Sequence, residues 1–132
     1  FCIENGIVPL IIASGSSNSK LKSLESIIKN KFGITPSIYD DTDFQTIQEE
    51  SLKKNVNILI GNSGGKFISE KINVPLLRMG FPIHDRIGGQ RIMHLFYDGG
   101  MRLLDDLVNT LLERKYSLYR EKMFNKYYKG VD

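Results

Sequence analysis

The feature that most constrains the fold is an alternation of short apolar runs with amphipathic, helix-like stretches. The apolar runs lie at residues 6–15, 36–40, 56–62 and 74–82. The helix-like stretches lie at residues 21–32, 42–55 and 66–73. Strands that alternate with helices need crossover connections, which produce a parallel sheet with helices on both faces. The pattern therefore predicts an α/β domain with a doubly wound, Rossmann-like sheet.

The end of the chain follows a different pattern. A loop rich in glycine and charge is expected at 83–91, then a short edge strand at 92–96. A long helix is predicted from Asp98 through the segment YSLYREKMFNKYY, because leucines recur at helical spacing. Its expected apolar stripe consists of Leu103, Leu104, Leu107, Val108, Leu111 and Leu112. Met123, Phe124, Tyr127 and Tyr128 are expected to form a further, exposed stripe suited to docking.

Length and composition predict a single α/β domain over residues 1–132, with 115–132 as a helical tail or the start of a linker. The chain begins with Phe1, so we expect a piece of a longer protein. The net charge is +3, and basic and acidic residues are interspersed until the C-terminal end. Because no basic residues cluster on one face, we expect no nucleic-acid partner. No apolar run approaches the roughly 20 residues of a membrane span, so a cytoplasmic protein with no membrane partner is expected. The single cysteine, Cys2, excludes an internal disulfide and a cysteine-rich metal site.

The segment NILIGNSGGKFISEK, residues 57–71, raises the question of a phosphate-binding loop. The P-loop pattern requires a glycine where Ile60 stands and a hydroxyl residue where Phe67 stands, so both defining features fail. Small residues at a helix start can still present backbone N–H groups to an anion. The alternative is a tight strand-to-helix turn capped by Asn62 or Ser63.

The remaining polar candidates have ordinary structural interpretations as well. SGSSNSK, residues 14–20, is either a phosphate loop or a capped turn, and Asp40, Asp41 and Asp43 are either cation ligands or turn and cap residues. His84 and His94 have no carboxylates at ligand spacing. No nucleophile–base arrangement is present, so by chemistry alone the chain is not a self-contained enzyme and no catalytic residue is assigned.

Three ordered motifs resemble the nitrogenase component 1 family. They are IGNSGGKFI, then VPLLRMGFPIHDR with the family's Gly-Phe-Pro-x-x-Asp-Arg pattern, and then YDGGMRLLDDLVNTLLE. The resemblance covers residues 56–114 closely, and residues 6–55 fit the topology. It implies the C-terminal α/β domain of a β-type subunit. The family-motif residues are Gly61, Asn62, Ser63, Gly65, Lys66, Gly80, Phe81, Pro82, Asp85 and Arg86.

The resemblance also distinguishes subunit types. In α-type subunits, a histidine that holds the molybdenum-containing cofactor stands where this chain has Gly80, and His84 falls four positions too late to replace it. The cysteines that hold the bridging cluster belong to an N-terminal domain of the family. The resemblance thus implies a β-type chain with no metal or cofactor in this fragment, although the parent complex is expected to carry iron–sulfur clusters and an iron–molybdenum cofactor precursor.

Among β-type members, the loop FPIHDRIGGQR and the basic, aromatic tail resemble the scaffold that assembles the iron–molybdenum cofactor. In some clostridial scaffolds the tail leads into a fused radical-SAM domain. The alternatives are the β subunit of catalytic molybdenum–iron nitrogenase and a stand-alone nucleotide- or phosphate-binding module. The implied partners are a paralogous α-type subunit, in a heterotetramer, and the nitrogenase reductase, or iron protein.

Within this resemblance, Lys66, Arg86 and Arg91 are expected to add positive charge beside a cleft through which an anionic cluster intermediate passes. The alternative is that these charges only hold a loop in place. Asp85 and Arg86 are expected to order residues 83–91 through charge-assisted hydrogen bonds.

Overall fold

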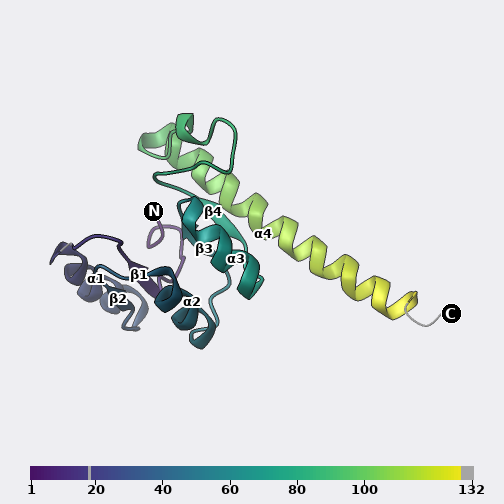
Figure 1. The fold of residues 1–132 in the computed structure, drawn as a ribbon, viewed down its shortest axis with the longest axis horizontal. Helices are drawn as coiled ribbons and strands as arrows, with labels where there is room; N and C mark the ends of the chain where they lie inside the picture. Colours follow the sequence, from purple (N-terminus) through teal and green to yellow (C-terminus); the bar gives the residue numbers. More distant parts are fainter. Residues whose placement is uncertain (18, 129–132) are drawn as a thin grey trace. The chain divides into compact units, whose positions relative to one another are not determined.

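The computed structural model describes residues 1–17 and 19–128, and Figure 1 shows their course. The strands are β1 (Ile11–Ala13), β2 (Ser37–Tyr39), β3 (Leu59–Gly61) and β4 (Leu76–Arg78). The helices are α1 (Ser23–Phe32), α2 (Phe44–Lys53), α3 (Lys66–Ile72) and α4 (Phe96–Tyr127). Single 3₁₀ turns occupy Ser19–Lys22, Ser63–Gly65 and Gly89–Arg91. The predicted α/β class, with parallel strands and a long C-terminal helix, is confirmed.

The chain divides into two compact units, one of residues 1–57 and one that begins at Ile58. In the first, β1 pairs in parallel with β2, with Ile12 opposite Ile38, and α1 connects them. In the second, β3 pairs in parallel with β4, with Ile60 opposite Leu77, and α3 connects them. Each pair is therefore a β–α–β element. The single domain predicted over residues 1–132 stays a prediction.

The ends of the helices follow from local sequence. Gly33 ends α1 in the left-handed region at φ 68°, where it lacks the Cβ that makes this conformation costly. Asp43 precedes α2, and its carboxylate accepts a hydrogen bond from the Thr46 N–H at 2.8 Å. Asn73 ends α3 at φ 53°. Because each signal acts over a few residues, these ends agree with the sequence-based prediction to within a few residues.

The core of the second unit forms where α3, β4 and α4 meet. Its buried apolar side chains are Ile68, Val74, Leu76, Leu77, Ile83, Leu103 and Leu107. The predicted stripe of α4 is therefore only partly right. Leu103 and Leu107 are buried at 1% and 4% exposure, whereas Leu104, Val108, Leu111 and Leu112 are 37–45% exposed.

Two further predictions from the apolar pattern are wrong. The edge strand expected at 92–96 is absent, since 92–95 are irregular and α4 begins at Phe96. The run 6–15 forms only the three-residue strand β1, half-buried at Ile11 and Ile12 and exposed at Ala13, rather than a strand buried on both faces. An apolar run shows that burial is favourable, but a strand also needs a hydrogen-bonded partner along its whole length. No helix in the described part of the chain combines the length and apolar character required to cross a membrane.

Candidate functional site

The best-defined polar site lies at the carboxyl ends of β3 and β4, where loops of parallel sheets commonly form binding sites. The turn after β3 and the loop after β4 are joined there by hydrogen bonds. The Ser63 N–H donates to the Pro82 carbonyl at 3.1 Å, and the Asn62 side-chain amide donates to the Phe81 carbonyl at 3.2 Å. The fold thus brings two motifs, Gly-Asn-Ser and Gly-Phe-Pro, into direct contact.

Ser63 is the centre of this junction. It is only 2% exposed. Its hydroxyl accepts a hydrogen bond from the His84 N–H at 3.0 Å and donates one to a carboxylate oxygen of Asp85 at 2.5 Å. A buried hydroxyl satisfied on both sides fixes the position of the two residues that it bonds.

Asp85 is also held by Arg78, the last residue of β4. The Arg78 Nε lies 2.9 Å from both carboxylate oxygens, and a terminal guanidinium nitrogen lies 2.6 Å from Oδ2. Both side chains are largely buried, with exposures of 17% and 11%. We call Ser63, Arg78 and Asp85 the Ser63 network. Bidentate arginine–carboxylate pairing of this kind is among the stronger and more directional polar contacts in proteins.

The network determines the protonation state of its carboxyl group. Hydrogen bonds from the Arg78 guanidinium, and then from the Ser63 hydroxyl, hold the pKa of Asp85 well below its usual range. Asp85 is therefore ionised throughout the physiological pH range. It acts as a fixed acceptor and not as an acid that exchanges protons near neutrality.

The same geometry decides whether the glycine-rich turn can hold a phosphate. The Gly64 N–H donates to the Asn62 side chain, and the Gly65 N–H donates to the Asn62 carbonyl. The Lys66 N–H donates to the Ser63 carbonyl, and the Ser63 N–H is used by Pro82. All four N–H groups of Ser63–Lys66 thus have internal acceptors. The structure supports the capped-turn interpretation, with Asn62 as the cap, and leaves none of these groups to cradle an anion.

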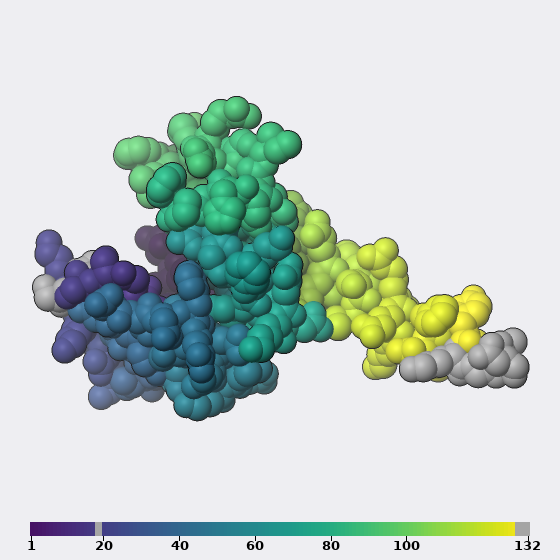
Figure 2. Space-filling model, in the orientation of Figure 1, coloured from purple at the N-terminus to yellow at the C-terminus, as the bar shows by residue number. Residues whose placement is uncertain are grey.

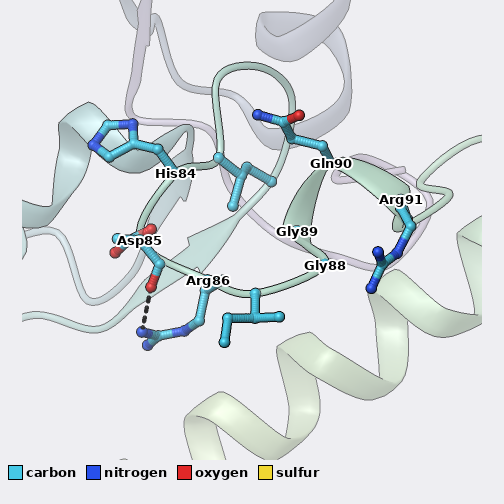
Figure 3. A pocket seen from close by; sticks show the side chains of 9 residues that line it. His84, Asp85, Arg86, Gly88, Gly89, Gln90 and Arg91 are labelled. Atoms are coloured by element: carbon cyan, nitrogen blue, oxygen red, sulfur yellow. Dashed lines mark hydrogen bonds between the residues drawn. The ribbon is translucent and has the colours of Figure 1, made fainter.

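The loop after the network curls back on itself over residues 83–91 (Figure 3). Ile83 and Gly89 are buried in it, and a Cβ at Gly89 would lie 2.3 Å from the Ile83 Cγ2. The remaining side chains, among them those of His84, Gln90 and Arg91, spread in different directions around the loop. The loop is therefore closely packed at its base, and its rim carries polar side chains together with the fully exposed Ile87.

The three cations proposed from the sequence occupy unequal positions. Lys66 pairs with Glu70 at 3.8 Å on the exposed side of α3. The Arg86 guanidinium donates a charge-assisted hydrogen bond to the backbone carbonyl of Asp85 at 3.1 Å. Within the described residues, neither Arg86 nor Arg91 forms an ion pair. These two arginines keep their charge available at the rim of the loop.

The other polar candidates do not assemble into a site. Asp43 caps α2, and the hydrogen bond from the Thr46 backbone lowers its pKa. Over residues 1–17 and 19–128, no three His, Cys, Asp or Glu side chains gather as metal ligands. The phosphate interpretation of 14–20 includes Asn18, which lies outside the described residues.

Sequence reasoning missed one member of the network, Arg78. A signal was available: Arg78 is the only charged residue in the run VPLLRMGFP, and it precedes Asp85 by seven positions. A lone charge at the end of a buried strand needs a partner, and the nearest carboxylate in the sequence supplies it.

The chain is similar to known proteins in both sequence and fold. A family model described as nitrogenase component 1 type oxidoreductase matches residues 1–112. Nitrogenase molybdenum–iron protein beta chains from Frankia alni and Azotobacter vinelandii are 36% and 33% identical over 86% of the chain. A solved structure described as nitrogenase Cp1 at pH 6.5 superimposes with a TM-score of 0.79 at 31% identity, over 86% of this chain and 25% of that one. The chain spans about a quarter of the length of these relatives.

These matches define the class of protein, an α/β domain related to nitrogenase beta chains. With the match over residues 1–112, the chain belongs to the nitrogenase component 1 family.

Proposed function

We propose that this chain is the C-terminal domain of a β-type subunit in a nitrogenase-like complex, and that the subunit is a scaffold for assembly of the iron–molybdenum cofactor. The observation that carries the β-type assignment is Gly80, which takes a left-handed backbone at φ 85° where an α-type chain would place its cofactor-binding histidine. A histidine there would be strained by its Cβ. The beta-chain relatives support the same assignment.

The scaffold role rests on the loop at 83–91. Its Gly88-Gly89-Gln90-Arg91 sequence resembles the scaffold members and lacks a histidine-rich continuation. The structure adds a physical reason for one of these residues, because Ile83 leaves no room for a side chain at position 89. Arg86 and Arg91 are exposed outside the packed base of this loop, where their charge is available to an anionic cargo.

A second candidate is the β subunit of catalytic molybdenum–iron nitrogenase. The names of the relatives favour it, since those quoted above are molybdenum–iron protein beta chains. The third alternative, a nucleotide- or phosphate-binding module outside this family, loses its basis because the family is established and the N–H groups of the glycine-rich turn are occupied.

The described residues contain one cysteine, Cys2, and nowhere bring three potential metal ligands together. In the proposed complex, other parts of the subunits hold the clusters, and this domain contributes charge and shape. Arg86 and Arg91 would attract an anionic cluster precursor as cargo, whereas Lys66 is partly neutralised by Glu70. The proposed partners are an α-type subunit in a heterotetramer and the iron protein, in the cytoplasm.

The test uses the full-length parent, purified without oxygen together with its α-type partner. Acetylene reduction is measured with the iron protein and ATP, and cluster donation is measured with cofactor-free nitrogenase as acceptor. A scaffold gives little acetylene reduction but activates the acceptor. Strong acetylene reduction would establish the catalytic β subunit instead.

The charge hypothesis has its own test in the same preparation. Arg86→Gln with Arg91→Gln is expected to lower cluster loading several-fold, because attraction between unlike charges accelerates association. Lys66→Gln is the matched control with little expected effect. Unchanged loading in the double variant would show that the arginines only hold the loop in place.

A further inference from the structure

The second half of α4 carries an apolar face that no described part of its own unit covers. From Lys115 to Tyr128, every residue except Met123 is exposed. Tyr116, Tyr119 and Phe124 are 56–59% exposed, and Leu118 is 48% exposed. In Figure 2 this yellow-green part of the helix stands clear of the remainder of the second unit.

Apolar residues form a continuous stripe along one face of this part of α4, and all but Met123 are exposed. Leu112, Tyr116, Tyr119, Met123 and Tyr127 follow one another at intervals of four, three, four and four residues. These intervals place side chains on one face of a helix. We call these five residues the α4 stripe.

The α4 stripe lies on the opposite side of the helix from the face that packs in the core. Leu112 follows the buried Leu103 by nine residues, and Tyr116 follows the buried Leu107 by nine. Nine residues correspond to about two and a half turns, which places the two sets half a turn apart. α4 therefore has two apolar faces, and burial of one in the core leaves the other available to a partner.

The charges beside the α4 stripe define that partner. Lys115, Lys122 and Lys126 lie along one edge, and Arg120 lies along the other with Glu113 two turns before it. Glu121 follows Leu112 by nine residues and so faces away from the stripe. In the part of the chain that the structure describes, none of these four cations forms an ion pair. Arg120 donates only to the Tyr116 carbonyl, and the Lys126 ammonium lies 5.0 Å from the centre of the Tyr127 ring.

We propose that the α4 stripe docks against a protein surface that is apolar at its centre and lined with carboxylates at its edges, such as the acidic face of a partner helix. Apolar area supplies affinity, and unlike charges at the rim supply orientation and rate. A second copy of this chain fits poorly, because Lys115, Arg120 and Lys122 would meet one another across the interface.

The test measures binding of the chain to two synthetic helical peptides of about four heptads. Both have leucine and valine at their core positions, and the flanking positions carry glutamate in one and lysine in the other. We expect the acidic peptide to bind with a dissociation constant on the order of 10 μM, weakening with added salt, and the basic peptide to bind at least about tenfold more weakly. Equal binding of the two peptides, or none of the acidic one, would overturn the proposal.

Variants locate the effect on the helix. Tyr116→Ala with Tyr119→Ala, and separately Lys115→Glu with Lys122→Glu, are each expected to weaken binding about tenfold or more. Ser117→Ala with Asn125→Ala changes the opposite side of the same helix and serves as the matched control, with binding unchanged. Circular dichroism checks that each variant keeps its helix, and the exposure of these positions leaves the core intact.

The same preparations decide between other occupants. Anionic phosphatidylserine vesicles are tested by co-sedimentation, and the mass in solution is measured by light scattering. Vesicle binding that the tyrosine substitutions abolish, or a dimer that they dissociate, would assign the stripe to a lipid surface or to a second copy and overturn the proposal.

Discussion

At the scale of single residues, the site at the ends of β3 and β4 depends on a few hydrogen bonds and one close packing contact. Ser63, Arg78 and Asp85 satisfy one another's hydrogen bonds, and Gly89 lets the following loop close on Ile83. The Ser63–Asp85 bond joins residues 22 positions apart in the sequence, whereas Ile83 and Gly89 meet within a single loop.

Gly89→Ala tests the closeness of the loop. The added Cβ would lie 2.3 Å from the Ile83 Cγ2, so Ile83 must move. We expect a loss of about 1–3 kcal/mol in the free energy of unfolding, measured by urea denaturation. Gly100→Ala is the control, because a Cβ there meets nothing within 4 Å and alanine favours the helix. If the two variants prove equally stable, the loop is looser than the structure shows.

Asp85→Asn tests the network through pH. The pKa of Asp85 is lowered in the folded protein, so unfolding takes up a proton when the pH falls below the unfolded value of about 3.9. The stabilisation by Asp85 is thus fully present above that pH and is lost as the pH falls through the folded pKa. We expect the melting temperature of the wild type to exceed that of the variant at pH 7, and the difference to shrink below about pH 4. A difference independent of pH would contradict the ion pair as its source.

At the scale of secondary-structure elements, the sequence predicts type and position better than extent. The cap at Asp43, Gly33 after α1 and the period of α4 all act locally, and the structure confirms them. The length of β1 and the strand expected at 92–96 depended on a pairing partner, and here the prediction failed. Periodicity predicted one apolar stripe on the first half of α4, but not that the core would bury only Leu103 and Leu107 of it.

Two adjacent positions of α4 test which face is buried. Leu107 is 4% exposed and Val108 is 45% exposed. Leu107→Ala is expected to lower the free energy of unfolding by about 2–5 kcal/mol because it leaves a cavity, while Val108→Ala should cost less than about 1 kcal/mol. Chemical denaturation measures both. The reverse order would place the packed face of α4 on the other side.

At the scale of the whole molecule, the chain consists of two compact units, each with its own pair of parallel strands. Large apolar side chains remain exposed in both, among them Phe44, Phe67, Phe96 and Tyr97 at 54–93%. Because the chain spans about a quarter of its relatives' length, these surfaces are candidates for contact with other parts of a larger assembly.

Amide hydrogen exchange on Leu107→Ala tests the division into units. The cavity lies in the second unit, so we expect amides of β3, β4 and α3 to lose protection, while those of β2 and α2 keep theirs. The variant Val108→Ala, which changes an exposed position of the same helix, provides the reference exchange pattern. Equal loss of protection in both units would show that they unfold as one.

The sequence by itself determined the α/β class, the helix ends and the family motifs, because each is written in residue types and short spacings. Tertiary structure decided three things: that the Ser63 hydroxyl bonds Asp85 from 22 positions away, that Asn62 caps the glycine-rich turn, and which face of α4 the core buries. The first and the last depend on which distant groups meet in space. A hydrogen bond forms only within about 3 Å, and no local pattern specifies that distance.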